Sequence, residues 1–152
     1  MNYISQKIPG VILIEPKIHD DSRGYFFESF RNDLLEKKIN YKISFVQDNE
    51  SKSSKGVLRG LHYQVSPYAQ SKLVRVIKGR VLDVIVDIRL NSPTFGQHIA
   101  IELNEDNKKQ LFIPSGLAHG FLVLSDTAIF SYKTDNYYAY THERGIAYND
   151  EK

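Results

Sequence analysis

Two short segments of this 152-residue chain hold residues suited to acid–base chemistry. The first spans residues 56–64 (GVLRGLHYQ) with His62 near its end, and Lys72 follows it. The second spans residues 114–119 (PSGLAH) and ends at His119. An imidazole, with a reference pKa of about 6.5, can remove a proton around neutral pH. An ammonium has no lone pair to donate and repels a divalent ion. These residue types therefore predict organic acid–base chemistry rather than a metal site.

The spacing of these residues resembles the two signature motifs of the cupin superfamily. Five residues separate Gly56 from His62, and six separate Lys72 from Gly79. Two metal ligands of the motif are replaced, because Gln64 stands at the second histidine and Lys72 at the glutamate. The resemblance implies an all-β fold, a cupin-type jelly roll (double-stranded β-helix) with one or two short helices. It also makes a metal-dependent cupin oxygenase a weak alternative.

The rest of the chain reads as a succession of short strands broken by turns, which is typical of a β-sandwich or barrel. We expect one helix over residues 31–39, and a hairpin turn at residues 78–80. The expected strands cover residues 11–14, 24–30, 72–77, 80–89, 99–103, 110–113, 121–124 and 129–133. In the strand over residues 80–89, Asp83 and Asp87 share a mixed face opposite a wholly apolar one. We expect residues 1–152 to form a single domain.

Composition excludes several classes of function. The net charge is only +2 and no basic run occurs, so we expect no nucleic-acid partner. No apolar run is long enough to span a membrane, and the first residues lack a signal-peptide core, which predicts a cytoplasmic protein. The absence of cysteine excludes disulfides, thiol nucleophiles and Cys-ligated metals.

Longer blocks along the chain resemble the dTDP-4-dehydrorhamnose 3,5-epimerase family. These blocks include residues 23–30 (RGYFFESF), 45–49 (FVQDN), 55–64 (KGVLRGLHYQ), 69–76 (AQSKLVRV), 83–89 (DVIVDIR) and 113–124 (IPSGLAHGFLVL). The resemblance implies an isomerase of dTDP-rhamnose biosynthesis that needs no metal or other cofactor. Its reaction would be the 3,5-epimerisation of dTDP-4-dehydro-6-deoxy-D-glucose to dTDP-4-dehydro-L-rhamnose.

The resemblance also assigns the chemistry to particular residues. It implies that His62 is the base and Tyr132 the proton donor on the opposite face of the sugar. Lys72 and His119 would surround the sugar carbonyl, where positive charge stabilises an enolate oxygen. Asp83 would either orient His119 or pair with Lys72, and a purely structural strand carboxylate is the alternative.

A second set of residues resembles the family's clamp on the nucleotide. Arg23 and Arg59 match diphosphate contacts, because a guanidinium fork suits phosphate oxygens. Tyr138 matches the aromatic residue that stacks on thymine. The remaining matched polar contacts are Glu28, Gln47, Asn49 and Glu143. Because members of the family exchange N-terminal strands in a homodimer, part of this set can come from a neighbouring subunit.

The family continues beyond the position of Lys152, and the segment that this chain lacks carries the aspartate paired with the catalytic histidine. We therefore expect His62 to lack its orienting partner, which would lower activity. Two alternatives stay open: a dTDP-ketosugar monoepimerase of the same fold, and a catalytically silent nucleotide-sugar-binding cupin.

Overall fold

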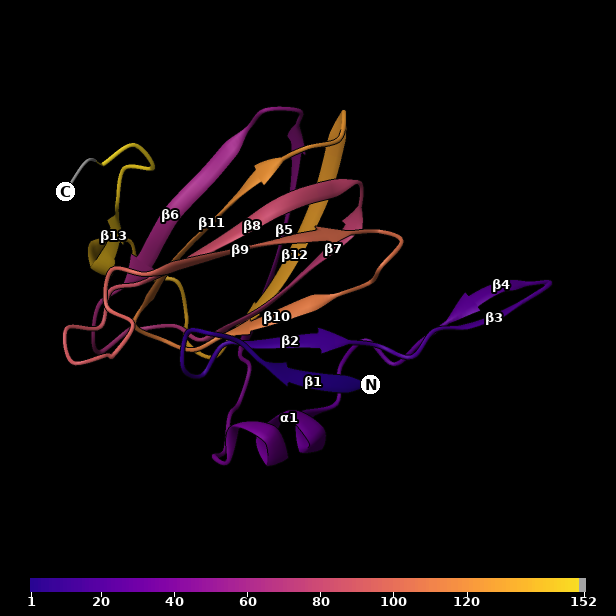
Figure 1. The fold of residues 1–152 in the computed structure, drawn as a ribbon, viewed down its shortest axis with the longest axis horizontal. Helices are drawn as coiled ribbons and strands as arrows, with labels where there is room; N and C mark the ends of the chain where they lie inside the picture. Colours follow the sequence, from indigo (N-terminus) through magenta and orange to yellow (C-terminus); the bar gives the residue numbers. More distant parts are fainter. Residues whose placement is uncertain (151–152) are drawn as a thin grey trace.

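The computed structural model describes residues 1–150 and consists mainly of two facing antiparallel β-sheets (Figure 1). The first sheet has the order β1 (Asn2–Ser5), β2 (Ile12–Glu15), β10 (Gln110–Ile113), β7 (Lys72–Lys78), β12 (Thr127–Thr134) and β5 (Gln47–Ser54). The second has the order β13 (Glu143–Gly145), β6 (Leu58–Gln64), β11 (Leu117–Val123), β8 (Arg80–Asp87) and β9 (His98–Asn104). This arrangement confirms the predicted jelly roll.

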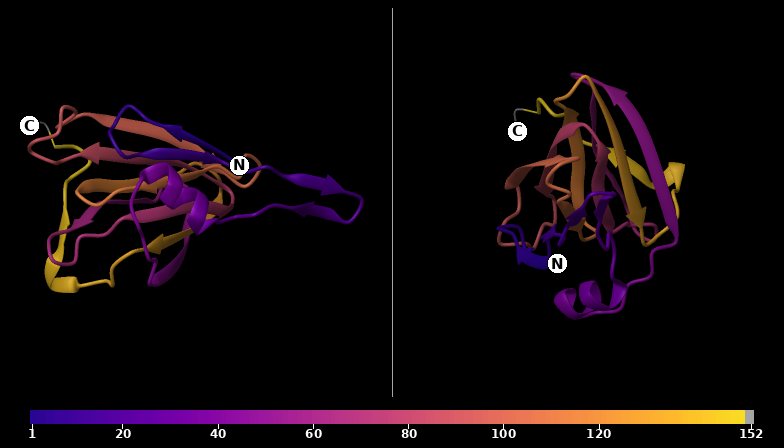
Figure 2. Two further views of the ribbon diagram at one scale, coloured as in Figure 1. Left: turned by 90° about the horizontal axis from the view of Figure 1, so that it is seen from below. Right: turned by 90° about the vertical axis from the view of Figure 1, so that its right-hand side faces the viewer.

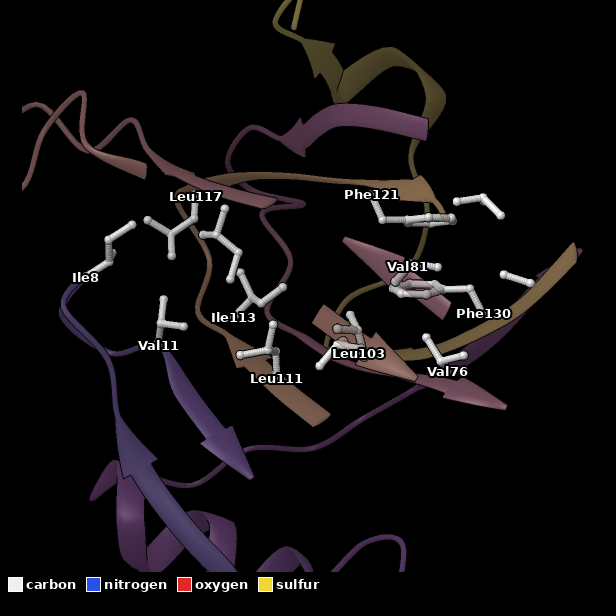
Figure 3. Close-up of a cluster of buried hydrophobic side chains, with 14 residues drawn as sticks. Ile8, Val11, Val76, Val81, Leu103, Leu111, Ile113, Leu117, Phe121 and Phe130 are labelled. Carbon is white, nitrogen blue, oxygen red and sulfur yellow. The ribbon is translucent and has the colours of Figure 1, made fainter. Parts of the chain in front are cut away.

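The main hydrophobic core lies between the two sheets (Figure 3). Alternate residues of each strand point into it, as the two-residue period of a strand requires. Phe121 on β11 and Phe130 on β12 stack with their ring centroids 4.1 Å apart, and so join the two sheets. Leu111 and Ile113 fill the other end beside Val11. Apolar side chains therefore fill much of the space between the sheets. Buried polar residues, among them Asp83 and His119, occupy other positions there.

A second core lies on the outer face of the first sheet, under helix α1 (Asn32–Ile39). Leu35 of the helix packs there with Leu73 and Phe112. The helix ends at Asn40, whose φ of 63° is the left-handed cap conformation that asparagine tolerates. The predicted helix over residues 31–39 is thus confirmed to within one residue. A single 3-10 turn, η1 (Tyr140–His142), precedes β13.

Strands β3 (His19–Asp21) and β4 (Gly24–Phe26) form a separate hairpin that projects away from the barrel (Figures 1 and 2). Tyr25 and Phe26 on this arm are 58% and 68% exposed. The sequence predicted one strand over residues 24–30, whereas the strand ends at Phe26. An aromatic arm of this kind has no apolar surface of its own barrel to pack on.

One turn prediction is wrong. Residues 78–80 do not close a hairpin, because β7 belongs to the first sheet and β8 to the second. Gly79, with a φ of 80°, instead carries the chain sharply from one sheet to the other. A Cβ at this position would collide with the carbonyl oxygen of Thr127, so the crossing requires glycine.

Five strands were not predicted at all: β1, β3, β5, β6 and β13. β5 carries the polar sequence QDNESKSS, and β1 lies in the first residues of the chain. β5 is held by a full ladder with β12, in which Asn49 lies opposite Tyr132 and Ser51 opposite Phe130. Its inward-facing side chains are therefore polar, and they line the same interior as the predicted site. Within residues 1–150, no helix is long and apolar enough to cross a membrane.

Candidate active site

Four predicted residues meet inside the barrel, although they come from four different strands. Lys72 lies on β7, Asp83 on β8, His119 on β11 and Tyr132 on β12. His119 Nε2 and Asp83 Oδ2 are 2.8 Å apart in a hydrogen bond that is buried. Lys72 Nζ lies 5.9 Å from the centroid of the Tyr132 ring and is attracted to the Asp83 carboxylate. The interior thus holds a cation, a carboxylate, an imidazole and a phenol in one cluster.

Burial sets the electrostatics of this cluster. It lowers the pKa of Lys72, and the Asp83 and Glu143 carboxylates act in the opposite direction. Burial also raises the pKa of Asp83, and the nearby His119 and Lys72 oppose that shift. Asp83 Oδ1 is buried and has no hydrogen-bond partner among the described residues. The charges of Lys72 and Asp83 therefore depend on each other, and the carboxylate retains an unused acceptor.

The surroundings of Tyr132 favour the protonated form of its phenol. Burial raises the pKa of its phenol, while a side-chain hydrogen bond with Asn49 opposes the shift. The phenol therefore stays protonated around neutral pH. Gln47 Nε2 donates to Asn49 Oδ1 over 2.9 Å and so orients the amide beside Tyr132. Strand β5, which pairs with β12 in the same sheet, thus provides the hydrogen-bond partner that orients the Tyr132 hydroxyl.

A β-bulge in β6 brings Arg59 and His62 to the same face. In the ladder with β11, His62 lies opposite His119 and Arg59 opposite Phe121, with a register shift between the two pairs. Residues three apart on a regular strand point to opposite faces. The extra residue removes this conflict, so both side chains line the interior. Arg59 Nε donates to Ser53 Oγ on the first sheet over 2.8 Å.

Two facing glycines allow the strands to approach at this bulge. A Cβ at Gly60, whose φ is 127°, would lie 2.5 Å from Gly120 Cα. A Cβ at Gly120 would lie 2.6 Å from the Arg59 carbonyl oxygen. Such distances are far shorter than van der Waals contact, so each position requires glycine. The sequence shows the two glycines, but nothing in it shows that they face each other.

His62 lies at the exposed rim of the interior, opposite Gly145 of β13. Within residues 1–150, its ring has no hydrogen-bond or ion-pair partner. Across the barrel the first sheet presents Lys72 and Tyr132. The residue matched to the family's base thus lies on one sheet, and Lys72 and Tyr132 lie on the facing one.

The remaining matched residues of the barrel surround the mouth of this interior. Tyr138 is half-exposed, and its Oη donates to Glu143 Oε2 over 2.9 Å. The backbone N–H of Tyr138 donates to Gln47 Oε1 over 3.0 Å. Gln47, Tyr138 and Glu143 therefore form one connected edge, which continues through Asn49 to the phenol of Tyr132.

Two predicted residues are not brought to this site. Arg23 lies on the projecting arm, where its guanidinium pairs with Asp21 at 2.6 Å and is largely exposed. Glu28 follows the arm and pairs with Arg31 at 3.2 Å. The arm itself projects away from the barrel (Figure 2). Within residues 1–150, neither side chain forms a hydrogen bond or ion pair with a residue of the interior cluster.

Sequence reasoning also missed two residues that support the site. Ser53, which accepts the hydrogen bond from Arg59, lies on the unpredicted strand β5. Gln64 was read only as a missing metal ligand, but its buried amide bonds three backbone groups. The alternation of polar residues in β5 was the one available signal for Ser53. Among residues 1–150, no group of three or more His, Asp or Glu side chains is arranged to hold a metal.

Another depression lies away from this cluster, on the outer face of the second sheet. It measures about 710 Å³ and is lined mainly by apolar residues, including Leu58, Leu82, Val84, Val86 and Phe95. This is the wholly apolar face of β8 that the sequence predicted. The titratable residues in its lining are Asp87, His98, Tyr148 and Asp150, and none of the matched site residues is among them.

The jelly roll with motif residues on its inner walls defines this chain as a cupin. The profile of the family described as dTDP-4-dehydrorhamnose 3,5-epimerase matches residues 5–152. The chain is 56% identical to the enzyme of that name from Shigella flexneri, over 99% of this chain and 83% of the relative. The chain belongs to the dTDP-4-dehydrorhamnose 3,5-epimerase family, and is an isomerase.

Two solved structures extend the comparison. A Legionella pneumophila 3,5-epimerase in complex with dTDP-4-keto-L-rhamnose matches with a TM-score of 0.94 and 52% identity, over 98% of this chain and 79% of that one. A 3'-monoepimerase from Streptomyces bikiniensis in complex with dTDP-quinovose matches with a TM-score of 0.90 and 33% identity, over 94% and 72%. The fold is thus shared by enzymes that differ in how many centres they invert.

Proposed function

We propose that this chain converts dTDP-4-dehydro-6-deoxy-D-glucose to dTDP-4-dehydro-L-rhamnose without a cofactor, as a step of dTDP-rhamnose biosynthesis. The hydrogens at C3 and C5 both flank the C4 ketone, so removing either gives an enolate. Inversion then needs a base on one face and an acid on the other, with positive charge at the oxygen. The observation that carries the proposal is the placement of His62 on one sheet and Tyr132 with Lys72 on the facing sheet.

Each residue has a defined task in this reaction. The His62 imidazole takes the proton from carbon, and the Lys72 ammonium and His119 stabilise the enolate oxygen. Asp83 orients His119 through their hydrogen bond, and its carboxylate stabilises the charged ammonium form of Lys72. Tyr132 then delivers its phenolic proton to the opposite face. Its raised pKa keeps that proton available at neutral pH.

Substrate binding uses the mouth of the barrel and, in our proposal, a second copy of the chain. Arg59 binds the diphosphate, and Tyr138 stacks on the base beside Gln47, Asn49 and Glu143. Arg23 and Glu28 reach a site only if the arm of one subunit enters the barrel of another. The exposed aromatic arm and the apolar groove on the second sheet support such a homodimer. A cytoplasmic location stays a prediction.

The test is incubation of the chain with dTDP-4-keto-6-deoxy-glucose in D2O, followed by NMR. We expect deuterium at both C3 and C5. We expect His62→Ala to lower exchange by about 10²–10⁴-fold, the usual contribution of a general base. Tyr132→Phe should exchange protons yet give little inverted product, because only the return of the proton is impaired.

Other outcomes separate the alternatives. Exchange at one centre alone would make the chain a monoepimerase, like the Streptomyces bikiniensis structure it resembles. Binding of the dTDP-sugar with no exchange would make it a silent binding protein. Equal exchange by His62→Ala and the unaltered chain would refute the assignment of the base. Loss of activity on treatment with a chelator would contradict the cofactor-free mechanism.

A further inference from the structure

Gln64 uses its whole side-chain amide to hold two segments of backbone. It lies on β6, two residues after His62, and is only 6% exposed. Its Nε2 donates to the carbonyl oxygens of Tyr68 at 2.7 Å and Tyr137 at 3.2 Å. Its Oε1 accepts from the backbone N–H of Ala139 at 2.8 Å. Both donors and an acceptor of the amide are therefore engaged.

These bonds flank one functional residue. Tyr137 and Ala139 are the neighbours of Tyr138 in the chain, so Gln64 fixes the backbone on both sides of it. Gln47, from the other sheet, accepts the N–H of Tyr138 itself. The hydroxyl at the end of the Tyr138 side chain donates a hydrogen bond to Glu143. Glu143 in turn lies opposite Gln64 in the β6–β13 ladder. The half-exposed Tyr138 ring is thereby fixed at the mouth before any ligand arrives.

We propose that Gln64 is a positioning residue for Tyr138, which pre-organises the ring for stacking on the nucleotide base; this rests on the function proposed above. At the position where a cupin motif carries a metal ligand, this chain instead carries an amide that positions the binding edge. Pre-organisation lowers the ordering cost of binding. Gln64 therefore acts on affinity for the nucleotide, and the chemical step stays with the interior residues.

The test measures dTDP binding by calorimetry and turnover by NMR, on the full chain. Gln64→Met removes all three hydrogen bonds at similar volume, and Gln64→Asn is a milder variant that keeps an uncharged amide but withdraws it from its partners by one methylene. We expect Gln64→Met to weaken dTDP binding by about tenfold, a typical cost of lost pre-organisation, with kcat within about threefold. Should Gln64→Met fail to fold, Gln64→Asn carries the same comparison.

Gln70 provides the matched control. It is also a glutamine that holds this loop, since its Nε2 donates to the carbonyl oxygen of Asn136 over 2.9 Å. That bond does not flank Tyr138. We expect Gln70→Met to lower the melting temperature without changing the affinity for dTDP by more than about twofold. Equal weakening of dTDP binding by Gln70→Met and Gln64→Met would overturn the proposal.

A double-mutant cycle tests whether Gln64 acts through Tyr138. In a Tyr138→Ala background, Gln64→Met should change the affinity by less than about twofold, because the positioned ring is gone. Additive losses would refute the inference while leaving the epimerase function intact. Conversely, a non-additive cycle in a chain that binds dTDP but never epimerises would support the inference and refute the function. A chain that binds no dTDP would refute both.

Discussion

Asp83 and Asp87 lie on the same face of β8 and are both buried, yet their surroundings differ completely. The Asp87 carboxylate accepts hydrogen bonds from the Arg89 guanidinium at 2.8 and 2.9 Å, and from the hydroxyls of Ser92 and Thr94 at 2.6 Å. These bonds, with the Arg89 guanidinium foremost, hold its pKa well below the usual range. Among the residues that the structure describes, His119 is the one hydrogen-bond partner of the Asp83 carboxylate, and burial raises the pKa of Asp83.

In the mechanism that we propose, this difference separates a structural carboxylate, Asp87, from a functional one, Asp83. Asp87 fastens the loop after β8, and Arg89 extends this network to the carbonyl oxygen of Pro9. Both oxygens of the Asp87 carboxylate are therefore already engaged in hydrogen bonds within the protein. Within residues 1–150, Asp83 keeps a buried oxygen without a hydrogen-bond partner, and it lies near Lys72, whose pKa burial lowers. Perturbed, incompletely paired groups of this kind are concentrated at active sites.

The largest effect on catalysis should come from replacing Lys72, whose ammonium the Asp83 carboxylate stabilises. We expect Lys72→Met to lower kcat by about 10²–10³-fold, as does removal of other groups that stabilise an oxyanion. The fold should be retained, because methionine replaces a buried charge with an apolar chain of similar length. Steady-state kinetics and a thermal melt check both statements. Activity within tenfold of the unaltered chain would show that Lys72 does not stabilise the enolate.

The next effect should come from Asp83 itself. Asp83→Asn keeps the shape but removes the negative charge beside His119 and Lys72. We expect kcat to fall by about 10–10²-fold, because both groups lose the orientation or charge that the carboxylate supplies. The melting temperature should change little, since a buried, incompletely paired charge contributes little to stability. A steep fall in stability with normal kcat per folded molecule would make Asp83 structural, like Asp87.

A smaller effect should follow from disturbing the bulge that aligns Arg59 with His62. We expect Gly120→Ala to lower kcat/KM by about tenfold, since a small displacement of reacting groups is costly. Gly96→Ala is the control, because its φ of 77° adds strain with no atom within 4 Å of the new Cβ. That variant should lose stability but keep its kinetics. Identical losses of kcat/KM in both would show that the bulge has no special role.

The smallest effect on catalysis should come from Asp87. We expect Asp87→Asn to keep kcat within about twofold but to lower stability by about 2–3 kcal/mol, as expected for breaking a buried charged network. Because the pKa of Asp87 is lowered by folding, its stabilisation is present above the unfolded pKa of about 3.9 and is lost as the pH falls through the folded pKa. The stability difference from the unaltered chain should therefore shrink in strong acid. Chemical denaturation at neutral and acid pH measures this.

The sequence predicted two short elements that pack on the cores nearly to the residue. The strand over residues 110–113 is confirmed at both ends, and the helix to within one residue. It failed for β5, whose inner face is polar because it lines the site rather than the core. It also failed at Gly79, because a turn between sheets and a hairpin turn both favour glycine. Only the packing against Thr127 distinguishes them.

The site was predictable residue by residue but not as an arrangement. Lys72 and His119 are found from their motifs, and Tyr132 from resemblance alone. Their meeting depends on which strands face each other. The bulge at Gly60 could not be predicted, because it exists only in the pairing with β11. The position of Arg23 on a projecting arm likewise follows from the tertiary fold, since the local sequence reads as an ordinary strand.

The account rests most directly on the coupling between Asp83 and the buried Lys72 ammonium. That coupling is tested by the alkaline limb of the pH profile of kcat, measured for the unaltered chain, Asp83→Asn and Asp87→Asn. Burial lowers the pKa of Lys72, and the Asp83 carboxylate opposes this by stabilising the ammonium. Removing that carboxylate should therefore move the alkaline limb to lower pH, whereas Asp87→Asn should leave it in place. Three superimposed profiles, or an equal shift in both variants, would contradict the account.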